Sequence, residues 1–132
     1  MTIVRFVSKR KGPLYGVYDP RRPEVANPIA GAPWNPRSVG DREEQIERLL
    51  APVAPVNILA LGINYRKHGE ETALSAPSEP ILFLKATSSV IGPGHPIELP
   101  AAGPDQVDYE AELAVVIGKT AKNITPEEAP DY

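Results

Sequence analysis

The chain has 132 residues, of which 42% are hydrophobic, enough for one ordinary domain or a small domain and part of another. Its formal net charge of −3 gives no electrostatic reason to expect binding to nucleic acid. It has no cysteine, which excludes disulfides, thiolate zinc sites and a cysteine nucleophile. No segment approaches the roughly 20 apolar residues that span a bilayer, and no apolar signal follows Met1. We therefore expect a cytoplasmic protein without membrane contact.

Two strands are predicted at the start of the chain. Residues 2–7 and 14–18 are rich in β-branched residues and alternate in polarity, and residues 8–13 between them are typical of a turn. The basic cluster in this turn, residues 9–11, is interpreted as a solvated hairpin turn rather than a binding patch. Residues 20–37 contain five prolines without periodicity, which predicts a long loop or a set of short extended pieces.

A short helix is predicted over residues 41–50. Asp41 can cap it, Glu44 follows three residues later, and apolar residues fall on one face. The proline-containing residues 51–55 end this segment and are interpreted as a joint. We therefore expect a small N-terminal β domain over residues 1–55 and a second domain over residues 56–132.

The second part of the chain predicts further strands at residues 57–63, 81–85 and 107–117. A helix is expected over residues 65–74, with Asn64 placed to cap it, and residues 90–100 form a Gly/Pro-punctuated extension. Prolines number 16, about twice the usual share, which disfavours long helices. The sequence therefore predicts a mainly β chain with short helices, of the α+β class.

The last residues carry a helix-start signature. Thr125 can cap, Pro126 occupies the first helical position, and Glu128 follows three residues after the cap. Only four residues follow Glu128, too few for a stable helix. We expect this chain to be the N-terminal part of a longer protein.

Glu110 and Glu112 lie at the start of a short apolar run, residues 113–117, that predicts a buried strand. Alternate strand residues share a face, so these carboxylates would lie roughly 6.5–7 Å apart. Neighbouring carboxylates repel each other unless a cation lies between them, and Mg²⁺, Mn²⁺ or Ca²⁺ would suit carboxylate oxygens. The alternative is a polar strand end whose acids face water.

His68 and Glu71 are three positions apart in the expected helix and would be neighbours on one face. A carboxylate beside an imidazole fixes its tautomer and raises its basicity, as a general base acting on water requires. Glu70 would lie about 200° round the helix and would not face His68. The alternative is a solvated turn that happens to carry a histidine.

Four blocks together resemble the fumarylacetoacetate hydrolase family. They are GINYRKHGEE at residues 62–71, PILFLK at 80–85, IGPGHPI at 91–97 and YEAELAVVIGK at 109–119. Each block is weak alone, but they follow the family's order and spacing. The resemblance spans about residues 56–132, and the first fifty residues resemble the small β domain that often precedes this core.

The resemblance implies a mixed β-sheet roll, incomplete at the C-terminus here, that is usually a homodimer. It also implies Mg²⁺ or Mn²⁺, with Ca²⁺ as a possible substitute, held by an acidic triad. Members hydrolyse, decarboxylate or isomerise 1,3-dicarbonyl compounds and 2-oxo acids. Glu110 and Glu112 match the first two metal ligands, and His68 and Glu71 match a catalytic dyad on a closing segment. Lys85 matches a basic substrate-binding position, although a strand-end lysine extending to water is an equal alternative.

Two departures from the family pattern matter. Ala86 replaces the usual proline after the lysine, a minor change in loop stiffness. The third metal carboxylate of the family would fall roughly thirty residues beyond Glu112, past Tyr132. Two hypotheses follow: the N-terminal portion of a metal-dependent hydrolase, lyase or isomerase, or a catalytically silent fragment that acts as a structural or interaction module.

Overall fold

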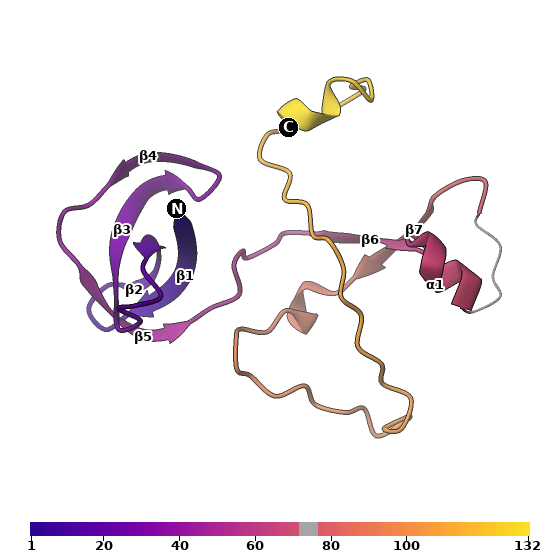
Figure 1. Cartoon of the computed structure of the whole chain (residues 1–132), viewed down its shortest axis with the longest axis horizontal. Helices are drawn as coiled ribbons and strands as arrows, with labels where there is room; N and C mark the ends of the chain where they lie inside the picture. The colour runs from indigo at the N-terminus through magenta and orange to yellow at the C-terminus, as the bar shows by residue number, and fades with distance from the viewer. Residues whose placement is uncertain (72–76) are drawn as a thin grey trace. The chain divides into compact units, whose positions relative to one another are not determined.

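The computed structural model describes residues 1–71 and 77–132. The chain divides into two compact units, Met1–His95 and Pro96–Tyr132 (Figure 1). Antiparallel strands dominate the regular structure, with one short α-helix and two 3₁₀ turns among the described residues. The mainly β class predicted from the sequence is therefore confirmed, whereas the domain boundary after residue 55 stays a prediction. Within the described residues, no helix is long and apolar enough to cross a membrane.

The N-terminal strands form a closed ring. The strands are β1 (Thr2–Ser8), β2 (Gly12–Tyr18), β3 (Val25–Ala32), β4 (Asn35–Val39) and β5 (Glu44–Leu49). β1 pairs with β2, β2 with β3, β3 with β5, and β5 again with β1, all antiparallel. β4 is added to β3 as an edge strand. Figure 1 looks into this ring, whose closure leaves four of the five strands paired on both sides.

The core of the ring centres on Phe6, which is completely buried. Gly16 of β2 makes room for its ring. A Cβ at Gly16 would lie 3.0 Å from Phe6 Cε1 and 2.9 Å from the backbone oxygen of Asn27. Because both neighbours belong to the packed ring of strands, this position requires the smallest residue.

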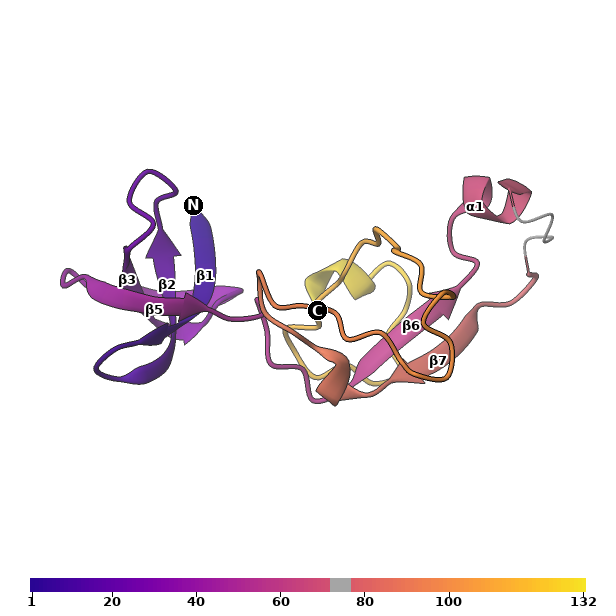
Figure 2. The same ribbon diagram turned by 90° about the horizontal axis from the view of Figure 1, so that it is seen from below.

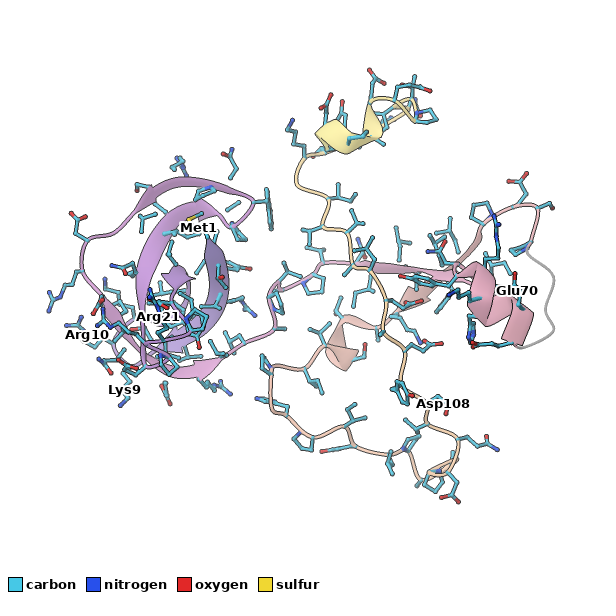
Figure 3. The ribbon with its side chains drawn as sticks, in the orientation of Figure 1. Met1, Lys9, Arg10, Arg21, Glu70 and Asp108 are labelled. Carbon is cyan, nitrogen blue, oxygen red and sulfur yellow. The ribbon has the colours of Figure 1, made fainter. Side chains whose placement is uncertain are left out.

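Glu44 is a buried charge in this ring, with its side chain 1% exposed. Its Oε1 accepts from Arg10 Nη2 at 3.2 Å and pairs with Lys11 Nζ at 3.1 Å. Lys11 is the largest influence that lowers the Glu44 pKa, and it outweighs the opposing effect of burial. The turn between β1 and β2 is thus confirmed, but two of its three basic residues, Arg10 and Lys11, pair with the Glu44 carboxylate. Figure 3 labels Arg10 in this turn.

One sequence prediction in this region is wrong, and another left two alternatives that the structure decides. Residues 41–50 do not form a helix, because β5 occupies most of this segment and pairs with both β1 and β3. Of the two alternatives for residues 20–37, the structure has the short extended pieces rather than one long loop, because β3 and most of β4 fall within them. Prolines are tolerated in an edge strand, and Pro36 lies in β4. Long-range strand pairing therefore overrides the local helix signal of residues 41–50.

Strands β6 (Ile58–Gly62) and β7 (Ile81–Lys85) form an antiparallel ribbon, and α1 (Arg66–Glu71) follows β6 (Figure 2). Both strands were predicted. The predicted helix over 65–74 is present as α1, and residues 72–74 lie outside the described part of the chain. Four leucines share one face of the ribbon and are exposed: Leu59, Leu61, Leu82 and Leu84. A two-stranded ribbon with an uncovered apolar face is marginal by itself in water.

The second unit contains no strand in its described residues, so the strand predicted over 107–117 is wrong. A strand needs a neighbouring strand for its backbone N–H and C=O groups, and no strand in the described part of the chain pairs with this segment. Its apolar side chains are correspondingly exposed, with Leu113 at 82%. The C-terminal turn is better organised, since the backbone N–H of Gly118 donates to the carbonyl oxygen of Tyr132 at 2.7 Å.

The predicted helix start at Thr125 is present as a tight turn. The Glu128 carboxylate accepts from the Thr125 backbone N–H at 2.8 Å, which is one half of the expected capping box. A 3₁₀ helix, Ala129–Asp131, follows instead of an α-helix. The helix-start signature therefore produces a single turn of helix, as expected where so few residues follow.

Candidate functional site

The segment that carries the predicted dyad begins directly after β6. The backbone N–H of Gly69 donates to the carbonyl oxygen of Tyr65 at 3.1 Å, which closes the first helical turn. His68 and Glu71 are both on α1 and both exposed, whereas Gly69 between them is buried. Figure 3 labels Glu70 on the same helix. The helical spacing that the dyad needs is therefore present, and contact between the two side chains stays a prediction.

Ile63 is a feature of this segment that the sequence interpretation missed. It lies between β6 and α1 with a φ of 53°, in the left-handed region of the backbone. That region costs a residue with a Cβ roughly 1–2 kcal/mol, and a β-branched residue is a rare occupant. Nothing in the local sequence signals it, because Gly62 next to it is the residue expected to take such a conformation.

Lys85 is the last residue of β7 and pairs in register with Ile58 of β6. Its Nζ lies 5.3 Å from the centre of the Phe83 ring, on the same face of the ribbon. This cation–π contact fits the alternative of a strand-end lysine whose stem covers apolar surface. An ammonium group there is also free to bind a carboxylate of a substrate, and that role stays a prediction.

Glu110 and Glu112 belong to the second unit and are exposed. Because no strand forms at residues 107–117, the alternation that would place both carboxylates on one face is not imposed by a sheet. In residues 1–71 and 77–132, no three histidine or acidic side chains are grouped so that they could hold a metal ion. The predicted metal pair therefore stays a prediction.

The donor chemistry of Glu110 and Glu112 nevertheless fits a hard divalent cation, because both supply carboxylate oxygens. The number of donors is smaller than a Mg²⁺ shell requires, and water or further ligands would have to complete it. These residues thus suit part of a magnesium or manganese site rather than a whole one.

The family of the chain follows from comparison with known proteins. The family described as "Fumarylacetoacetate (FAA) hydrolase C-terminal" matches residues 57–132, more than half of the chain. This match contains β6, α1, β7 and both predicted metal ligands. The chain belongs to the fumarylacetoacetate hydrolase family, a family of enzymes that includes hydrolases and isomerases.

Two curated relatives show the range of named activities. The chain is 48% identical over 85 residues to an oxaloacetate tautomerase of Xenopus laevis, matching 64% of this chain and 26% of the relative. It is 42% identical over 94 residues to a caffeoylpyruvate hydrolase of Neonothopanus nambi, matching 66% of this chain and 32% of the relative. The chain thus spans about a third or less of these relatives.

A solved structure has a fold similar to that of this chain. The crystal structure of Cg1458 aligns with a TM-score of 0.72 and 34% sequence identity, covering 96% of this chain and 47% of that chain. The N-terminal ring of strands and the segment with α1 both fall within this coverage, because it includes nearly all residues. The likeness therefore extends to the part of the chain before the family match begins.

Proposed function

We propose that this chain forms part of an enzyme that acts on 2-oxo acids or 1,3-dicarbonyl compounds with the help of Mg²⁺ or Mn²⁺. The observation that supports the proposal most is the family match over residues 57–132, within which α1 holds His68 and Glu71 at helical spacing. We further propose a mixed β-sheet roll for the complete catalytic domain and a homodimer for the whole protein.

His68 is the general base in this proposal. On α1 its imidazole is exposed, so it can reach a water molecule or an enolisable C–H of a bound substrate. Glu71, one helical turn away, orients the imidazole and stabilises its protonated form. The ammonium group of Lys85 attracts the carboxylate that a 2-oxo acid carries.

Glu110 and Glu112 are the proposed metal ligands. A divalent cation bound there would supply Lewis acidity toward the two oxygens of a 2-oxo acid or a 1,3-dicarbonyl group. The carboxylates themselves hold the cation by charge and by oxygen donation, which a neutral amide does far less well.

The substrate class is tested with the whole protein on two substrates. Oxaloacetate reports enol–keto tautomerisation, and an acylpyruvate reports hydrolysis of a carbon–carbon bond. We expect turnover of at least one, lost with EDTA and restored by Mg²⁺ or Mn²⁺. Turnover of neither substrate at any metal concentration would contradict the proposal.

A second candidate function, a silent structural module, is favoured by one observation: no three metal-binding side chains are grouped in the described part of the chain. Isothermal titration calorimetry with Mn²⁺ distinguishes the enzyme from the silent structural module. The enzyme proposal expects the whole protein to bind Mn²⁺ and the Glu110→Gln variant to bind it at least tenfold more weakly. A silent module binds Mn²⁺ no differently in the two proteins.

A further inference from the structure

We propose that Ile63 is a positioning residue for His68, and that its left-handed backbone sets the direction in which α1 leaves β6. The proposal rests on the proposed function, because it assigns Ile63 a role that acts through the general base. It adds a residue that carries no reactive group.

The connection between strand and helix contains few residues that could set this direction. β6 is held to β7 by five register pairs, the last of which joins Gly62 to Ile81. On the other side, the carbonyl oxygen of Tyr65 already accepts from Gly69 within α1. Only two residues, Ile63 and Asn64, lie between these anchored points, and Ile63 has the positive φ.

The connection between β6 and α1, called the corner below, is stiff because residue 63 is an isoleucine. A glycine would adopt a φ of 53° without cost, and asparagine is the next most tolerant residue. The chain instead places its glycine one position earlier, where a Cβ would meet only ordinary contacts with Ile81 at 3.4 Å. A β-branched side chain narrows the range of backbone and side-chain conformations, so the corner has little freedom once formed.

The surroundings must hold this conformation, because strained backbone persists only where other contacts impose it. The Ile63 side chain is half-buried, which gives it packing contacts that a glycine would lack. A stiff corner keeps the His68 imidazole in one position relative to the ribbon. Catalysis is sensitive to this, since a displacement of about 1 Å can cost about 10²-fold in rate.

The test is Ile63→Gly in the whole protein, with amide exchange and steady-state kinetics measured together. We expect the Gly69 amide to exchange about tenfold faster, because the freed corner lets α1 open. We expect kcat to fall about tenfold with little change in KM, and the acid limb of the pH–rate profile to remain, because His68 itself is unchanged. Ile63→Val, which keeps the branched side chain, should show the Gly69 exchange rate and the kcat of the unmodified protein.

Asn123→Gly is the matched control, because Asn123 is the other described non-glycine residue with a positive φ, at 55°, and lies in the second unit. It removes the same kind of backbone strain and should leave both the Gly69 exchange rate and kcat unchanged. An effect of similar size from Asn123→Gly would overturn the assignment to Ile63.

The remaining outcomes separate this proposal from the proposed function. If the Gly69 amide exchanges at an unchanged rate in Ile63→Gly, the claim that Ile63 stiffens the connection between β6 and α1 is overturned, whatever the activity. Faster exchange with normal kcat, where His68→Ala is inactive, overturns the positioning role. If Ile63→Gly shows faster Gly69 exchange and both Ile63→Gly and His68→Ala keep a normal kcat, the role of His68 in catalysis is overturned, and with it the positioning role of Ile63. The claim that Ile63 stiffens the connection between β6 and α1 is then still supported.

Discussion

Ser8 Oγ donates a hydrogen bond of 3.0 Å to Glu44 Oε2, and both residues are almost completely buried. The same hydroxyl oxygen accepts from the backbone N–H groups of Arg10 and Lys11 at 3.2 and 3.3 Å. One side chain thus joins β1, the following turn and β5. This relationship explains how the ring accommodates a buried carboxylate, since buried charges are tolerated only when they are paired and hydrogen-bonded.

Replacing Ser8 by alanine should destabilise the chain by about 1.5–3 kcal/mol, the usual contribution of a hydrogen bond to a charged group. Thermal or urea unfolding measures the change. Ser38→Ala is the control, because Ser38 is exposed on the edge strand β4 and should change stability by less than about 0.5 kcal/mol. Equal stability of the two variants would mean that the buried hydrogen bond contributes nothing.

Stability should fall in acid because of Glu44. Its pKa is lowered from 4.5 in the folded chain, chiefly by the Lys11 ammonium group. The folded form therefore binds the proton less readily than the unfolded form, so this contribution is complete above pH 4.5 and lost as pH falls through the lowered pKa. Melting temperatures from pH 7 to pH 3 should show this loss, and Glu44→Gln should melt lower at pH 7 with a flatter acid dependence.

A second carboxylate, that of Asp19, also contributes to the loss of stability in acid and needs its own control. The Asp19 pKa is lowered to about 2, chiefly by hydrogen bonding from the Arg21 side chain. Its contribution is lost between pH 3.8 and about 2, below the onset of the Glu44 effect. Asp19→Asn should therefore leave the fall in melting temperature between pH 4.5 and pH 3.8 as in the unmodified chain. If Glu44→Gln keeps the full acid dependence there, Glu44 is not the group responsible.

Gly16→Ala should destabilise the ring by about 1–3 kcal/mol, the usual cost of overpacking a well-filled core. The added methyl group would meet Phe6 and the backbone of Asn27 at 3.0 and 2.9 Å. Gly103→Ala provides the control, because a Cβ there meets only the Gln106 side chain at 3.5 Å or more. Denaturant unfolding compares the two, and a neutral Gly16→Ala would show that the ring expands easily.

The sequence predicts those elements whose signals are local. β1, β2, β6 and β7 each follow from strand patterning in a few residues, and α1 from the cap and polarity that follow β6. β5 could not be predicted, because Glu44 is placed by Ser8, which lies 36 residues away, rather than by its neighbours in sequence. The apolar run at 113–117 has strand propensity, but no described strand pairs with it.

The candidate site divides in the same way. The helical spacing of His68 and Glu71 is a local property and was predicted correctly. The left-handed conformation of Ile63 was not predictable, because local propensity assigns such a φ to glycine rather than to a β-branched residue. The geometry of Glu110 and Glu112 depends on sheet pairing that the described residues do not supply, so sequence patterning alone cannot fix it.

Glu110→Gln and Glu112→Gln should each abolish metal-dependent turnover in the whole protein, because an amide binds Mg²⁺ far less well than a carboxylate. Activity measured against Mg²⁺ concentration at saturating substrate checks this. Asp108→Asn is the nearby control, since it removes one negative charge from the same exposed segment without touching a proposed ligand. Unchanged activity of both glutamate variants at low Mg²⁺ would rule them out as ligands.

The pH–rate profile of His68→Ala in the whole protein tests the central claim, that α1 carries the general base. We predict a fall in kcat of about 10²–10⁴, the usual range for losing a general base, with loss of the acid limb and unchanged metal affinity. Glu71→Ala should show a smaller fall, and Glu70→Ala, on the same helix but about 200° from His68, should show none. Retention of both the rate and the acid limb in His68→Ala would contradict the account.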